Sequence, residues 1–138
     1  NALQKSVQLS KKELEAVCEQ VLFTDNGFHL KIFSNEGQKI EEKKYTKWMD
    51  YDKIKGSPCV RTRKQGDYLV VNSAGGRKKL NRIFIDEKIP AGLRDQIPVV
   101  AAGSKILWIP GGRMNEQYKI TSTTGRVLEL HYQGGVLT

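Results

Sequence analysis

The period of the apolar residues constrains the fold of this chain most strongly. Phe28, Leu30 and Ile32 stand at every second position. Successive side chains of a strand point to opposite faces, so this spacing predicts a strand with one mostly buried face. Two further apolar runs, over residues 99–100 and 106–109, flank a Gly-Ser pair and predict a hairpin. The chain is therefore expected to be built mainly on a sheet.

A second pair of strands is predicted between Val60 and Val71, with a turn at Gly66. On the first of these strands, Arg61 and Arg63 are two residues apart and so share one face. Two guanidinium groups lie side by side there. We expect that face to meet solvent or an anion.

An amphipathic helix is predicted near the amino end, over about 10–23. Ser10 is followed three residues later by Glu13, a pair that can satisfy free backbone N–H groups at a helix start. Apolar residues then recur at one-face helical spacing up to Phe23, and Gly27 lies in the turn that ends the helix. The apolar stripe can pack on this chain or on a neighbouring domain.

Two shorter helices are predicted further along the chain. Leu80, Ile83 and Phe84 fit one apolar face of a helix, from which the neighbouring basic side chains would point outward. Those basic side chains are Lys78, Lys79 and Arg82. A second turn of helix is predicted over about 91–95, between two prolines.

The remaining segments complete an α+β fold. Residues 35–44 are charged and predict a loop or an exposed strand pair, and residues 118–122 and 126–132 predict a final hairpin turning at Thr124-Gly125. The fold class expected is a mostly antiparallel sheet or sandwich-like core with a few short helices. No apolar run approaches the roughly 20 residues of a membrane span, so a cytoplasmic protein without a membrane partner is expected.

Net charge points to a polyanionic partner. The chain has 23 Lys and Arg against 15 Asp and Glu, a formal net charge of +8. Nucleic acid is the leading interpretation, and a surplus spread over the surface for solubility stays open. The candidate RNA-binding residues are Arg61, Arg63, Lys64, Arg77, Lys78, Lys79, Arg82 and Arg113. They suit the closely spaced phosphates of an A-form stem, which is recognised mainly by shape and backbone.

Signs of catalysis or metal binding are few. Cys18 and Cys59 lie far apart, and each of the two histidines, His29 and His131, lies in an alternating strand pattern, so no metal site or catalytic base is predicted. The charged residues around Pro90 are interpreted as structural ion pairs. They are Asp86, Glu87, Arg94 and Asp95.

Neither of two glycine pairs, Gly75-Gly76 and Gly111-Gly112, forms a phosphate-cradling motif. Gly75-Gly76-Arg77-Lys78-Lys79 lacks the order of a P-loop, so no cofactor site is predicted in this chain. Gly111-Gly112-Arg113 forms either a tight turn after a strand or a flexible backbone that approaches one phosphate. Both interpretations stay open.

Several separated blocks resemble the final domain of bacterial tRNA(Ile)-lysidine synthases. The blocks are 78–90 (KKLNRIFIDEKIP), 94–100 (RDQIPVV) and 106–111 (ILWIPG), with 61–67 upstream and 118–121 downstream in the same order. The likeness covers roughly Tyr45 to Leu130. Because several blocks agree, it is more specific than one short motif.

This resemblance implies a module that binds tRNA(Ile), associated with holding its acceptor stem. The full-length enzyme would use ATP to adenylate the wobble cytidine and join lysine to it, in a catalytic domain without a counterpart here. The resemblance also implies a fold related to a tRNA-binding domain of phenylalanyl-tRNA synthetase. Residues 1–44 would be the end of a preceding helical region and a linker, and residues 45–138 the tRNA-binding domain.

The chain starts with Asn1-Ala2 rather than methionine, which is typical of an excised fragment; natural processing is the alternative. We therefore expect RNA binding without catalysis from this chain alone, and no binding of DNA. A protein–protein docking module, packed on the catalytic domain or an acidic partner, is the alternative function. A free-standing enzyme is disfavoured by the missing motifs.

Overall fold

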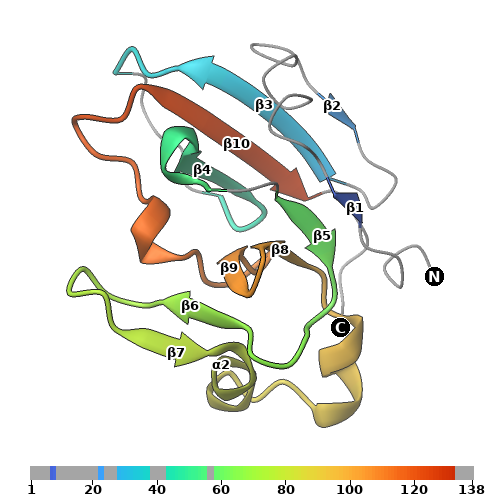
Figure 1. Cartoon of the computed structure of the whole chain (residues 1–138). Helices are drawn as coiled ribbons and strands as arrows, with labels where there is room; N and C mark the ends of the chain where they lie inside the picture. The colour runs from blue at the N-terminus through green and yellow to red at the C-terminus, as the bar shows by residue number, and fades with distance from the viewer. Residues whose placement is uncertain (1–6, 9–21, 24–27, 38–42, 56–57, 133–138) are drawn as a thin grey trace.

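Two mostly antiparallel sheets lie one above the other in this computed structural model, which describes residues 7–8, 22–23, 28–37, 43–55 and 58–132 (Figure 1). The four-stranded sheet has the order β2 (Leu22–Phe23), β3 (Phe28–Ser34), β10 (Arg126–Tyr132), β4 (Thr46–Asp50). The six-stranded sheet has the order β1 (Val7–Gln8), β5 (Cys59–Arg61), β8 (Val99–Ala102), β9 (Lys105–Trp108), β6 (Tyr68–Val70), β7 (Arg77–Lys79). The predicted α+β class with a sandwich-like core is confirmed.

The four-stranded sheet is built around β10. Its residues pair with all of β3, from Phe28↔Tyr132 to Ser34↔Arg126, and with β4 on the other side. The predicted alternation in β3 is confirmed, since Phe28, Leu30 and Ile32 are buried. The strand β3 lies before residue 44 and β10 lies after it, so this sheet takes strands from both sides of that position; the division of the chain there stays a prediction.

The predicted hairpin of residues 118–122 with 126–132 is wrong. Residues Glu116–Tyr118 form a 3-10 helix, η4, and the strand that follows pairs with β3 and β4 instead. Side chains satisfy the backbone here: the Asn115 side chain accepts a hydrogen bond from the Gln117 N–H, and the Thr124 hydroxyl accepts one from the Thr121 N–H. The Thr124 hydroxyl also donates to the buried Asp50 carboxylate at 2.9 Å. This loop therefore does not need a strand partner.

Most of the predicted amino-terminal helix, over 10–23, lies outside the described residues. Its last two residues are not helical, because Leu22 and Phe23 form β2 and pair with Leu30 and His29 of β3. Of the charged stretch 35–44, the structure describes only its two ends.

The predicted hairpin around Gly103 is confirmed as β8 and β9. A β-bulge interrupts it, since Val100 pairs with Trp108 but Ala101 pairs with Ile106, which leaves Leu107 as the extra residue. Side chains of this hairpin contribute to two apolar clusters. Val100, Leu107 and Trp108 join the cluster between the sheets. The second cluster takes Val99, Ala101, Ile106 and Ile109 from the same segment.

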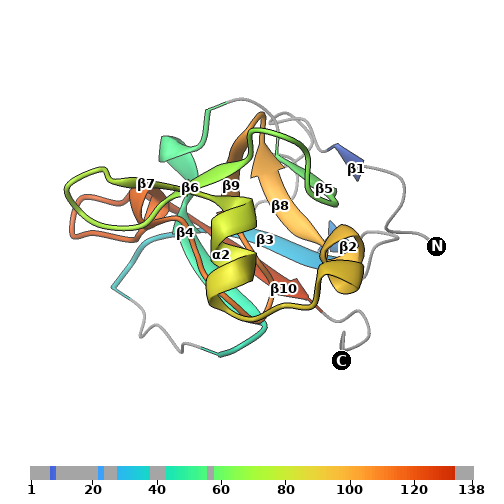
Figure 2. The same ribbon diagram turned by 90° about the horizontal axis from the view of Figure 1, so that it is seen from below.

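The second apolar cluster is covered by the helix α2 (Leu80–Asp86). Leu80, Ile83 and Phe84 are each 1% exposed, as the apolar spacing predicted. Figure 2 shows α2 crossing the face of the six-stranded sheet that points away from the four-stranded sheet. Both faces of this sheet are therefore covered in its central part.

Two further 3-10 helices lie in the connections between strands. The predicted turn after Pro90 is confirmed as η3 (Ala91–Gln96), and η2 (Tyr51–Lys53) follows β4. No helix among the described residues is long and apolar enough to cross a membrane.

Candidate nucleic-acid interface

Arg61 does not face solvent, which corrects the expectation that its face meets solvent or an anion. Its side chain is 5% exposed and its guanidinium forms two hydrogen bonds of 2.8 Å with the Asp67 carboxylate. It also donates to the carbonyl oxygens of Gly103 and Thr62. The hydrogen bonds that Arg61 donates to Asp67 are the main reason that the pKa of Arg61 is raised. Its donors are engaged inside the protein.

Three of the other candidates line one concave surface, here called the basic groove, with a volume of about 620 Å³. Its polar lining includes Arg63, Lys64, Lys79, Asn81, Arg94 and Asp95. Arg63 is held in place, because its guanidinium donates to the carboxylate of Asp95 at 2.7 Å and to the amide oxygen of Asn81 at 2.9 Å. Lys64 and Lys79 are exposed. The groove thus gathers cations from β7, η3 and the β5–β6 turn.

The buried Arg61–Asp67 pair shapes the turn that carries Lys64. The Asp67 carboxylate accepts a hydrogen bond from the Lys64 N–H at 2.7 Å, and the Asp67 N–H donates to the Lys64 carbonyl. Gly66 has φ +90°, a backbone conformation that favours glycine. The pair therefore positions a groove lysine even though Arg61 itself lies inside.

Lys78 and Lys79 precede the helix rather than begin it, which corrects the predicted helical placement of the basic run. Residues 77–79 form β7 and pair with β6, and the helix starts when the Leu80 N–H donates to the Asp67 carbonyl. The partners of these residues are the inner strand β6, which lies between β9 and β7, and Asp67 just before it. In β7, Lys78 pairs with buried Leu69 and shares its face, while Arg77 and Lys79 point to the other face.

A second group of cations, here called the Asp86 cluster, lies at the end of α2. Lys78 and Arg82 both form ion pairs with the Asp86 carboxylate, the latter at 3.2 Å. The pKa of Asp86 is lowered, first by its hydrogen bond with Lys78 and further by the charges of Lys78, Arg82 and Arg113. Three of the eight candidates therefore surround one carboxylate.

The eight candidates do not form a single face. Arg77 lies over the Tyr68 ring, 4.7 Å from its centroid, away from Lys78. The groove also contains a cation that was not among the candidates. Arg94 was assigned to structural ion pairs, but it lines the groove and its Nε–H donates to the Ile89 carbonyl. Its position on η3, folded back between two prolines, could not be inferred from local periodicity.

The two histidines, which were interpreted as ordinary strand residues, both lie in strands. His29 and His131 pair across β3 and β10 with ring centroids 5.6 Å apart, and His131 shares a 2.6 Å hydrogen bond with the Thr46 hydroxyl. Cys59 is a free, half-buried thiol, whereas Cys18 lies outside the described residues. In the part of the chain that the structure describes, no three His, Cys, Asp or Glu side chains gather to hold a metal ion.

The fold and the groove define a two-sheet α+β domain with a concave cationic surface. Sequence comparison then places it: the profile of the TilS substrate C-terminal domain family matches residues 59–130, and the chain belongs to this family. A solved structure described as the TilS C-terminal domain is 29% identical, covers 94% of this chain and 98% of its own, and has a TM-score of 0.65.

Whole proteins named tRNA(Ile)-lysidine synthase also match. The relative from Caldanaerobacter subterraneus is 48% identical over 64% of this chain and 19% of its own length. The relative from Clostridium acetobutylicum is 33% identical over 91% of this chain and 27% of its own length. The chain therefore spans about a fifth to a quarter of the curated relatives it matches. The likeness to phenylalanyl-tRNA synthetase stays a prediction.

Proposed function

We propose that this chain is the tRNA-holding C-terminal domain of a tRNA(Ile)-lysidine synthase, and that its basic groove contacts the phosphates of the acceptor stem. The main observation that supports the proposal is the groove, because it brings together four cations within one concavity. The names of the relatives supply the class of nucleic acid. ATP use and the joining of lysine to the wobble cytidine belong, in this proposal, to a separate catalytic domain in the cytoplasm.

Within the groove, the four cations have different freedom. Arg63 is fixed by Asp95 and Asn81, and the Arg94 Nε–H is engaged with a backbone carbonyl. Lys64 and Lys79 are exposed and make no ion pair in the described part of the chain. We assign phosphate contact chiefly to these two lysines. The fixed arginines shape the surface and add positive potential.

The Asp86 cluster contributes in a weaker way. One carboxylate shared by Lys78 and Arg82 cancels part of their charge, whereas Arg113 is exposed. Arg77 is similarly engaged with the Tyr68 ring. The order of importance proposed is therefore the two groove lysines first, Arg113 next, and the remaining candidates last.

The test is a salt titration of tRNA binding for the parent chain and for Lys64→Glu/Lys79→Glu. Three or four phosphate contacts predict an affinity that falls on the order of a hundredfold between about 50 and 200 mM salt. Loss of two contacts should reduce the slope of log affinity against log salt by roughly two. The matched control is Lys55→Glu/Lys119→Glu, which makes the same charge change at exposed lysines outside the groove.

A groove variant that is folded by circular dichroism but keeps the parental affinity and slope would contradict the assignment. A comparison of tRNA with duplex DNA distinguishes the docking alternative from the groove proposal. A docking module shows no preference between tRNA and duplex DNA of equal length, whereas the groove proposal expects preference for tRNA.

A further inference from the structure

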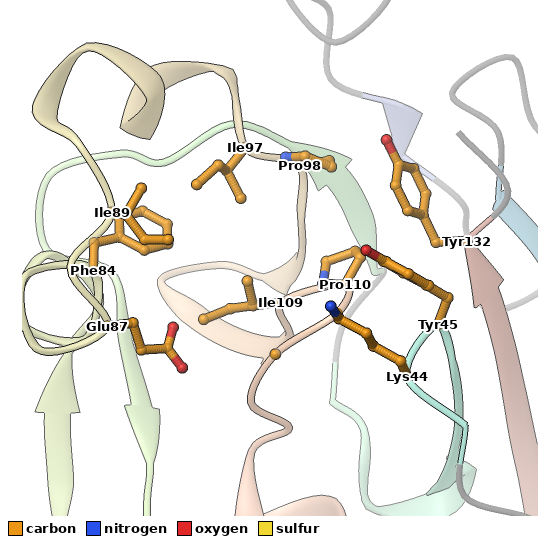
Figure 3. Close-up of a pocket in the computed structure, with 12 residues that line it drawn as sticks. Lys44, Tyr45, Phe84, Glu87, Ile89, Ile97, Pro98, Ile109, Pro110 and Tyr132 are labelled. Carbon is orange, nitrogen blue, oxygen red and sulfur yellow. The ribbon is translucent and has the colours of Figure 1, made fainter. Parts of the chain in front are cut away.

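A pocket of about 220 Å³ lies at the other end of α2 from the basic groove. We propose that it binds one unpaired, amino-bearing nucleobase of a single-stranded segment that continues from the RNA stem; this inference rests on the proposed function. Figure 3 shows the pocket between Phe84 on one side and Tyr45 and Tyr132 on the other, with Ile109 and Pro110 between them. It is called the tyrosine pocket below.

The apolar walls of the tyrosine pocket suit a flat aromatic ligand. Tyr45 and Tyr132 lie with ring centroids 6.2 Å apart, and Tyr132 is further held by the Phe28 ring at 4.8 Å. Tyr45 is only half-buried, so part of its ring is available to a ligand. Proteins hold unpaired bases by stacking them on such rings, because every base has a π face.

The backbone of Gly111 lies close to the Tyr45 ring. The φ of Gly111 is +78°, and a Cβ atom at this position would stand 2.9 Å from Cε1 of the Tyr45 ring. The backbone at Gly111 therefore approaches the ring more closely than a residue with a Cβ atom would allow. It packs directly against the Tyr45 ring and forms one side of the pocket.

Two opposite charges at the pocket favour a nucleotide over an apolar side chain of a protein. The Lys44 ammonium lies 5.6 Å from the centroid of the Tyr45 ring, where it can reach the phosphate of a stacked nucleotide. Glu87 extends from the opposite wall (Figure 3) and makes no ion pair in the described part of the chain. A carboxylate accepts hydrogen bonds from the amino group of a base. Adenine, cytosine and guanine have that group, and uracil lacks it.

The tyrosine pocket is next in the chain to two members of the Asp86 cluster. Gly112 lines it, and the next residue is Arg113, whose charge acts on Asp86; Glu87 follows Asp86 in the chain. An RNA strand that leaves the stem thus passes cations before it reaches the rings. The location favours an unpaired nucleotide next to the stem rather than a base within it.

The test compares three RNA hairpins that share one stem. The first ends blunt, the second has a 3′ overhang of C and A, and the third has a 3′ overhang of U. The C/A overhang should tighten binding about tenfold over the blunt stem, within the range expected for one stacked base. Tyr45→Leu should remove this gain and keep the affinity for the blunt hairpin. Glu87→Gln should reduce the preference for C/A over U. Glu116→Gln, at an exposed acid outside the pocket, is the matched control.

The outcomes separate the two proposals. Equal affinity for blunt and overhanging hairpins overturns the pocket assignment and leaves the groove in place, whereas failure to bind any hairpin contradicts the groove. NMR titrations with AMP and with UMP test binding at the tyrosine pocket independently of the RNA stem. AMP should shift the resonances of Tyr45 and Ile109 more than UMP does, and shifts elsewhere or none overturn the inference. A folding defect in Tyr45→Leu affects neither these titrations nor the Glu87 variant.

Discussion

Removing one partner of the buried Arg61–Asp67 pair should destabilise this domain severely. The Arg61 and Asp67 residues are 5% and 3% exposed, and two parallel hydrogen bonds of 2.8 Å join their charged groups. Asp67→Ala leaves the guanidinium buried without its counter-charge. It also removes the acceptor of the Lys64 N–H. Both effects act in the same direction.

The expected loss is about 3–5 kcal/mol, the usual cost of leaving one charge of a buried pair uncompensated. A domain of ordinary stability has roughly 5–15 kcal/mol in total, so Asp67→Ala removes a large share of it. Arg61→Met should cost less than Asp67→Ala, since methionine fills part of the volume and the remaining carboxylate keeps the Lys64 N–H. The double variant should then cost less than the sum of the two single variants by about 2–3 kcal/mol.

Urea unfolding followed by tryptophan fluorescence measures these differences, because Trp108 is fully buried between the sheets. The four proteins of the cycle are compared at one pH and one salt concentration. A loss below about 1 kcal/mol for Asp67→Ala, or additivity of the two single variants within 0.5 kcal/mol, would refute the reasoning. Either result would mean that the pair is not a buried structural unit.

Three further predictions concern stability. Phe84→Ala should lower the free energy of unfolding by about 3–5 kcal/mol, because its ring is 1% exposed under α2; an unchanged urea midpoint would contradict this. Gly111→Ala should cost about 1–3 kcal/mol, since φ is +78° and the new Cβ meets the Tyr45 ring; a neutral result in thermal unfolding would show that the ring moves aside. Burial raises the pKa of Tyr118 to about 12 from 10, so the folded state holds this proton more tightly than the unfolded state. That contribution is complete below pH 10 and falls by about 2–3 kcal/mol as pH rises towards 12; Tyr118→Phe should weaken this dependence in urea unfolding, and identical pH profiles would exclude the cause.

The period of the apolar residues predicted individual strands well, and it predicted the pairing of β8 with β9, but it did not predict the partner of β10. In β3, the buried face was correct, because alternation depends only on local backbone geometry. The partner of β10 was not, since a hairpin with residues 118–122 is the short connection and the observed pairing joins Val127 to Phe33 across the sequence. Long-range pairing depends on which faces pack together, and periodicity does not encode that.

The misplaced Arg61 has a related physical cause. Alternation assumes that a strand has one wet face, but the six-stranded sheet packs against the other sheet on one side and α2 on the other. A polar side chain on a strand inside such a layer is buried, so it needs a hydrogen-bonding or oppositely charged partner. Asp67 stands six residues further on and supplies the pair. The basic groove combines residues from three separated segments, so only some of its members could be found from the sequence.

The β8–β9 hairpin separates the two apolar clusters and supplies side chains to both. A local opening that exposes one cluster still leaves the hairpin held by the other. Its amide protons can therefore exchange with solvent only when both clusters open together, which is close to global unfolding. We expect the slowest hydrogen exchange in the domain at residues such as Val100 and Leu107, with free energies of exchange near the whole free energy of unfolding. Among the local openings of the native state, the opening of this hairpin should therefore be the rarest.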